Sequence, residues 1–209
     1  MANNTLLASD NFSSGSIAAG WSTIPTASTP VAVTSSPHYA EASVLNANCG
    51  IYWSGSTWPS DQTSEVTIQT ISTGSIVALI VRQSRIAYTN YMCEIKSGTA
   101  SAIYITVAGV QTQLLSLGIL IVSVGDVFSL QVAGSVLTVY QNGKPVGHVA
   151  DATITSGFPG VLFYSGTSIS NGQISAWRGY YAVQTDGLTW TSSRFLSQLS
   201  TQLNILDQF

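Results

Sequence analysis

The second half of the chain alternates hydrophobic and polar residues in short segments that are separated by turn residues. Alternation with a period of two is typical of a β-strand that buries one face. It predicts strands at residues 127–132, 136–140, 146–149, 159–164 and 173–181. Asn142-Gly143 predicts a two-residue hairpin turn, because such a turn needs positive φ at both central positions. Turns recur roughly every 8–12 residues, which indicates an antiparallel sandwich or barrel.

The first half has the same pattern with longer loops. It predicts strands at residues 5–8, 31–33, 39–45, 51–53, 62–71, 75–82, 91–95, 102–107 and 113–117. In segment 62–71, Val66 and Ile68 face one side, while Glu65 and Thr67 face the other, so this strand is half-buried. Segment 75–82 is mostly apolar and predicts a central strand.

The hydrophobic period changes near the C-terminus, after a predicted linker at residues 184–191. Leu196, Leu199, Leu203 and Leu206 follow at intervals of three and four, as on one face of a helix. We therefore divide the chain into a β-sandwich over 1–183, the linker, and an amphipathic helix over 192–209. So short a helix is marginal alone in water. It is expected either to dock on its own sandwich or to join copies of the chain as an oligomerisation element, and both alternatives stay open.

Two segments of the chain carry a family resemblance. One is the run GDVFSLQVAGSVLTVYQNGKPVGHVADATITSGFPGVLFYSG at 125–166, followed by ISNGQISAWRGY at 169–180. The other is the opening LASDNFSSGSIAAGWSTI at 7–24. Together they resemble the concanavalin A-like lectin/glucanase (laminin-G-like) jelly-roll domain superfamily over about residues 6–182. The resemblance implies an all-β, two-sheet antiparallel jelly-roll sandwich, to which the short C-terminal helix is added.

The number and sign of the charged residues limit which classes of partner the protein could bind. Only 7% of the residues are charged, against about 25% in average soluble domains. Net charge is −3 and there are six Lys and Arg, which argues against nucleic-acid binding. No apolar run reaches the roughly 18 residues of a membrane-spanning helix. No secretory signal is visible at the start of the sequence, so we expect an extracellular or virion-surface protein whose signal was removed or that is released by another route.

The cysteines and acidic residues give little support for a metal site. Cys49 and Cys93 are either bonded to each other or two buried thiols, and the sequence leaves both open. Calcium needs several converging oxygens, and no loop carries two acids. Asp10 or Asp126 could contribute to a calcium site, but an Asp that bonds its own turn is the commoner arrangement. We predict no cofactor, with calcium not supported by a clear site.

Catalytic patterns are missing from the sequence. Glucanases of the superfamily carry a Glu-x-Asp-x-x-Glu or Glu-x-Asp-x-Glu run, because glycosidases use two carboxylates at one bond. Here the acids are scattered singly, although Glu65 and Glu94 could meet if their strands are neighbours. A serine nucleophile would need a histidine, and His38 and His148 are expected at the surface. We therefore predict that the protein is not an enzyme.

Binding through aromatic side chains remains as the favoured function. Sugar rings stack on aromatic faces, while amides and hydroxyls pair with sugar hydroxyls. Trp58 is the best candidate, because Trp-Pro in a Ser/Gly-rich loop is hard to bury. The full set of candidate ligand-binding residues is Trp58, Trp53, Tyr52, Tyr88, Asn90 and Tyr91.

We therefore predict a non-catalytic, lectin-like module that binds an extracellular glycan or surface polymer. The alternative is a self-assembling structural protein, such as a virion decoration or fibre subunit or an extracellular filament component. It would form a homo-oligomer through the C-terminal leucines.

Overall fold

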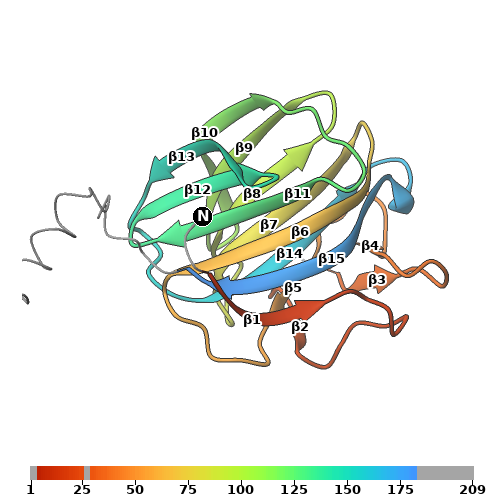
Figure 1. Cartoon of the computed structure of the whole chain (residues 1–209), viewed down its shortest axis with the longest axis horizontal. Coiled ribbons are helices and arrows are strands. Elements are labelled where there is room, and N and C mark those ends of the chain that lie inside the picture. The colour runs from red at the N-terminus through yellow and green to blue at the C-terminus, as the bar shows by residue number, and fades with distance from the viewer. Residues whose placement is uncertain (1–3, 26–28, 183–209) are drawn as a thin grey trace, which may run out of the picture.

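The computed structural model describes residues 4–25 and 29–182, which form two antiparallel β-sheets packed face to face (Figure 1). The eight-stranded sheet has the spatial order β13 (Lys144–Ala150), β12 (Val136–Gln141), β11 (Val127–Ala133), β6 (Gln62–Ile71), β15 (Gly172–Tyr181), β4 (Ala40–Ala42) and β3 (Val31–Val33), with β1 (Thr5–Asp10) also paired to β15. The seven-stranded sheet has the order β10 (Val110–Ile119), β9 (Ala100–Val107), β8 (Asn90–Lys96), β7 (Ser75–Gln83), β14 (Phe158–Ser165), β5 (Cys49–Trp53) and β2 (Trp21–Thr23). One 3₁₀ turn, η1 (Ile169–Asn171), precedes β15.

The predicted all-β, two-sheet architecture is confirmed. The predicted hairpin turn is also present: Asn142 and Gly143 have φ values of 52° and 75° and join β12 to β13. Strand β6 covers the residues predicted for it. The linker at 184–191 and the helix at 192–209, including its four leucines, lie outside the described residues.

The main core lies between the sheets, and Trp177 of β15 is its largest fully buried side chain. Val66 and Ile68 of β6 point into this core, as their alternation predicts. The indole Nε1 of Trp177 donates to Ser64 Oγ at 2.9 Å, and Ser64 Oγ donates to the carbonyl of Gly160 at 2.7 Å. This chain of hydrogen bonds ties β15 and β6 of one sheet to β14 of the other.

A second apolar cluster covers the outer face of the seven-stranded sheet. Ile80 of β7 stands opposite Met92 of β8, and both side chains are buried together with Leu162 and Tyr52. Strand β7 is therefore buried on both faces, which confirms it as a central strand. The outer face of the other sheet is polar instead, and there Glu65 accepts hydrogen bonds from Arg178 and Tyr180.

The two cysteines are free thiols. Both lie in the seven-stranded sheet with no exposed surface, Cys49 at the start of β5 and Cys93 in the middle of β8. Burial, with the nearby Glu94 carboxylate, raises the pKa of the Cys93 thiol far above its usual range. Of the two alternatives left by the sequence, the structure has the buried thiols.

Candidate functional site

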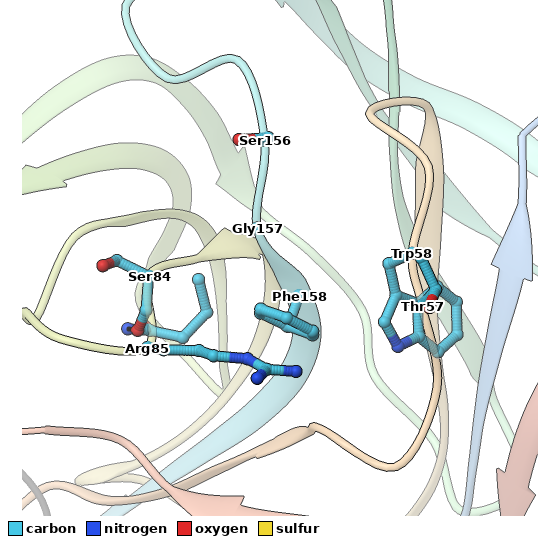
Figure 2. A pocket seen from close by; sticks show the side chains of 8 residues that line it. Thr57, Trp58, Ser84, Arg85, Ser156, Gly157 and Phe158 are labelled. Carbon is cyan, nitrogen blue, oxygen red and sulfur yellow. Dashed lines mark hydrogen bonds between the residues drawn. The ribbon is translucent and has the colours of Figure 1, made fainter.

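An open pocket of about 390 Å³ lies at one end of the sandwich, where β5 and β7 end and where β6 and β14 begin. This volume falls in the range of roughly 300–1,000 Å³ that is usual for ligand sites. Its walls come from three loops, β5–β6, β7–β8 and β13–β14, from the last residue of β7 and from the first residue of β14 (Figure 2). The lining residues are Thr57, Trp58, Gln83, Ser84, Arg85, Ser156, Gly157 and Phe158.

Trp58, the leading candidate from the sequence, forms one side of this pocket (Figure 2). Its Nε1 donates to the carbonyl of Trp53 at 3.0 Å, and its ring meets Trp177 edge-on at 6.4 Å between centroids. The ring also fills the space above Gly179 of β15, where a Cβ would lie only 2.4 Å from Trp58 Cη2. These contacts fix the ring while leaving it partly exposed.

Phe158 and Arg85 form the other side of the pocket. The Arg85 guanidinium carbon lies 4.4 Å from the centroid of the Phe158 ring, a cation–π arrangement. Phe158 in turn packs against Tyr52 at 5.5 Å between centroids. In Figure 2 the Arg85 side chain extends alongside Phe158, with Thr57 and Trp58 across the pocket. The site thus combines two aromatic rings, a cation and several hydroxyls.

A buried glutamine joins the loops on either side of the pocket. Gln62, at the start of β6, has no exposed surface. Its Nε2 donates to the carbonyl of Pro59, next to Trp58, at 2.9 Å and to the carbonyl of Gly157 at 3.0 Å. Its Oε1 accepts the backbone N–H of Arg82 at 3.1 Å. One amide side chain therefore sets the separation of the Trp58 and Phe158 loops.

Arg82 is a second buried residue that connects loops, and it is only 3% exposed. Its guanidinium donates to the carbonyls of Ser60 at 3.0 Å, Ile154 at 2.6 Å and Gly134 at 2.7 Å, and lies 3.7 Å from Asp61. Burial lowers the pKa of Arg82, while Tyr91 and Asp61 raise it, and a guanidinium stays charged in proteins. The cation therefore connects three loops through their backbone carbonyls.

Gly157 allows the β13–β14 loop to approach β7 closely. Its φ of +146° is a conformation that favours glycine, and an added Cβ would lie 2.4 Å from the Arg82 carbonyl carbon. A side chain at position 157 would therefore push the loop that leads into Phe158 away from β7.

Two of the six predicted residues are internal hydrogen-bonding groups. Tyr91 has no exposed surface; its hydroxyl donates to Asp151 Oδ1 at 2.5 Å and accepts the backbone N–H of Ile154 at 2.9 Å. Burial and the bond to Asp151 raise the pKa of Tyr91 to about 12. Asn90 is also fully buried and donates to Gln83 Oε1 at 2.7 Å. In this conformation neither side chain reaches solvent.

The other four predicted residues differ in position. Tyr52 and Tyr88 are 6% and 8% exposed and belong to the outer apolar cluster. Trp53 stacks on Trp177 at 5.7 Å and supports Trp58 through its carbonyl. Trp58 alone among the six lines the pocket, and its role in binding stays a prediction.

Sequence reasoning did not single out Arg85 or Phe158. Their signals were weak: Arg85 opens a polar turn, and Phe158 follows the Ser156-Gly157 turn.

None of the residues that line the pocket is Asp, Glu or His. Glu65 and Glu94 lie in different sheets, so the expectation that they could meet on neighbouring strands is wrong. Glu94 pairs with Lys96 at 2.7 Å and accepts from Gln111 at 2.9 Å.

The two candidate calcium ligands bond nearby turn groups. Asp10 accepts from the backbone of Phe12 and the indole of Trp21, and Asp126 accepts from the backbone of Ser123 and the amide of Asn142. Within residues 4–25 and 29–182 no three His, Cys, Asp or Glu side chains gather as metal ligands. In the same ranges no helix has the length and apolar character needed to cross a membrane.

Comparison with solved structures identifies the fold. The carbohydrate-binding module CBM66 from Bacillus subtilis superposes with a TM-score of 0.58 at 15% identity, over 87% of this chain and 96% of that one. The exoplasmic/lumenal domain of VIP36, solved with Ca²⁺ and mannose, gives 0.60 at 10% identity, over 82% and 87%. The protein has a concanavalin A-like jelly-roll fold. The resemblance found in the sequence is thereby confirmed at the level of fold.

Proteins that share this concanavalin A-like fold differ in activity. The Crh5 transglycosylase in its apo form matches with a TM-score of 0.56 at 12% identity, over 88% of both chains. No protein-family model and no curated protein sequence matches the chain. The fold is thus shown by structure alone, and function must be argued from the site.

Proposed function

We propose that the protein is a non-catalytic, lectin-like module and that the pocket between Trp58 and Phe158 binds a glycan. The observation that carries the proposal is the partly exposed Trp58 ring, held by its hydrogen bond to Trp53 across from a second aromatic ring. The C–H face of a sugar ring stacks on such a surface. Thr57, Ser84 and Ser156 supply hydroxyls at the same site for the sugar's own hydroxyls.

A binding role without bond cleavage is supported by the chemistry of the lining residues. Hydrolysis of a glycosidic bond uses two carboxylates that flank it. The nearest acids in sequence to the pocket loops, Asp61 and Asp151, are held by Arg82 and the backbone of Gly134, and by Tyr91 and Thr153, respectively. Both carboxylates thus stabilise the loops that shape the pocket.

A glycan array probed with the full chain tests this proposal. We expect selective binding to one class of glycan, and the bound glycan is expected to keep its chain length after a day with the protein. Absence of binding to every glycan would contradict the binding role. Shortened or transferred products in mass spectra would contradict the non-catalytic role.

Self-assembly remains a second candidate because of one surface feature. Ile119, Ile121 and Val124, around the end of β10, are 68%, 86% and 71% exposed. Apolar side chains that gather on a surface mark contact sites. Size-exclusion chromatography with light scattering on the full chain and on a 1–186 truncation separates the candidates. An oligomer that dissociates on truncation favours assembly through the C-terminal leucines. An oligomer that survives truncation favours assembly through the exposed residues near the end of β10, and a monomer in both cases favours the binding module.

A further inference from the structure

We infer that the glycan bound in the pocket carries an anionic group, a carboxylate or a sulfate, and that Arg85 binds this group. The inference rests on the proposed glycan-binding function and adds the chemical class of ligand. It depends on the guanidinium of Arg85, which forms no ion pair among the described residues, whereas those of Arg82 and Arg178 do.

Arg85 is the cation of the pocket and has no acceptor among the residues that the structure describes. The ion pairs among the described residues use Arg82, Lys96 and Arg178. Within the same part of the chain no hydrogen bond from the Arg85 guanidinium is present, and its one contact of this kind is the Phe158 ring. The side chain is exposed, and its guanidinium carbon lies over the Phe158 ring. Its planar set of N–H donors is thus unused at the edge of an open pocket.

The donor geometry of a guanidinium favours an anionic partner. Two parallel N–H groups match the two oxygens of a carboxylate or sulfate, and charge-assisted hydrogen bonds are about twice as strong as neutral ones. Stacking on Phe158 holds the fork in place, so less conformational freedom is lost on binding.

The surroundings of Arg85 do not oppose an anion. None of the eight lining residues is acidic, and Arg85 is the one charged residue among them. The protein as a whole has a net charge of −3, so an anionic ligand would be attracted by this local cation and not by the overall field. The hydroxyls of Ser84 and Ser156 line the same pocket.

Calorimetric titration of matched glycan pairs tests the inference. The pairs are oligogalacturonate with its methyl ester, sialyllactose with its methyl ester, and a sulfated galactan oligomer with its desulfated form. We expect the anionic member of at least one pair to bind about tenfold or more tightly than its neutral partner, as for a charge-assisted hydrogen bond. Carboxylate and sulfate are distinguished by which pair shows the preference.

Variants then assign the preference to Arg85. Arg85→Gln is expected to bind the anionic glycan no more tightly than the neutral one, and Arg85→Lys is expected to be intermediate, since it keeps the charge but loses the fork. Lys144→Gln is the matched control, because it removes one exposed positive charge at the β12–β13 turn, away from the pocket. Melting temperatures of these surface variants are expected to match the wild type.

The outcomes separate this inference from the proposed function. Equal binding of neutral and anionic members, or a preference that survives in Arg85→Gln, overturns the role of Arg85 while leaving glycan binding intact. Failure of every glycan to bind, in these pairs and on the array, overturns both.

Discussion

Arg82→Met is expected to lower the free energy of unfolding by about 3–5 kcal/mol, the usual loss when one partner of a buried ionic network is removed. Methionine matches the aliphatic part of the arginine side chain but donates no hydrogen bond, so the carbonyls of Ser60, Gly134 and Ile154 lose their donor. Asp61 loses its ion pair as well. Urea unfolding followed by tryptophan fluorescence measures the change.

The matched control is Arg178→Met on the outer face of the eight-stranded sheet. Arg178 makes an ion pair with Glu65 at 3.2 Å, but its side chain is 41% exposed. Exposed pairs contribute about 0–1 kcal/mol, so this variant is expected to stay close to the wild type. Equal losses of unfolding free energy in the two variants would show that Arg82 does not stabilise the connection between the loops.

Trp58→Ala is expected to weaken glycan binding by about 30-fold or more, which is the effect of truncating a dominant aromatic contact. The variant removes the ring on which the sugar would stack. Trp58→Phe keeps an aromatic face and loses the hydrogen bond to the Trp53 carbonyl, so a smaller loss is expected. Calorimetry with the best glycan from the array measures both.

Tyr140→Ala is the control for this comparison. Tyr140 lies in β12 of the eight-stranded sheet, where its hydroxyl donates to Gln131 Oε1 at 3.2 Å, and it is not a lining residue of the pocket. Its truncation is expected to leave the affinity unchanged. Because Trp58 contacts Trp177, near-ultraviolet circular dichroism is needed to show that Trp58→Ala keeps its core packing. Normal affinity in a folded Trp58→Ala variant would contradict its role in stacking.

Strand positions were predictable because burial of one face imposes a period of two on the sequence. Val66 and Ile68 alternate with polar residues in β6 for this reason, and Asn142-Gly143 marks its hairpin through backbone conformation alone. The partial exposure of Trp58 was predictable too, since a Trp-Pro pair among Ser and Gly has few sequence neighbours to cover it, while its role in binding stays a prediction.

Residues whose role depends on loops meeting in space were not predictable. Arg82 ends an apolar strand, and nothing local indicates that three carbonyls from distant loops converge on it. Tyr91 and Asn90 are candidate ligand residues in the sequence because an aromatic ring can stack on a sugar and a neighbouring amide can pair with its hydroxyls. The structure buries both side chains, with the Tyr91 hydroxyl bonded to Asp151 and the Asn90 amide nitrogen bonded to Gln83, and their role in binding stays a prediction.

Nuclear magnetic resonance titration of the ¹⁵N-labelled full chain with the best-binding glycan tests the central claim most directly. The account predicts that the indole N–H signal of Trp58 and the backbone signals of Arg85 and Phe158 shift on binding. Signals of Glu65 and Thr138, in β6 and β12 of the eight-stranded sheet, are expected to stay in place. Shifts confined to that sheet, with the Trp58 signals unchanged, would contradict a glycan site in this pocket.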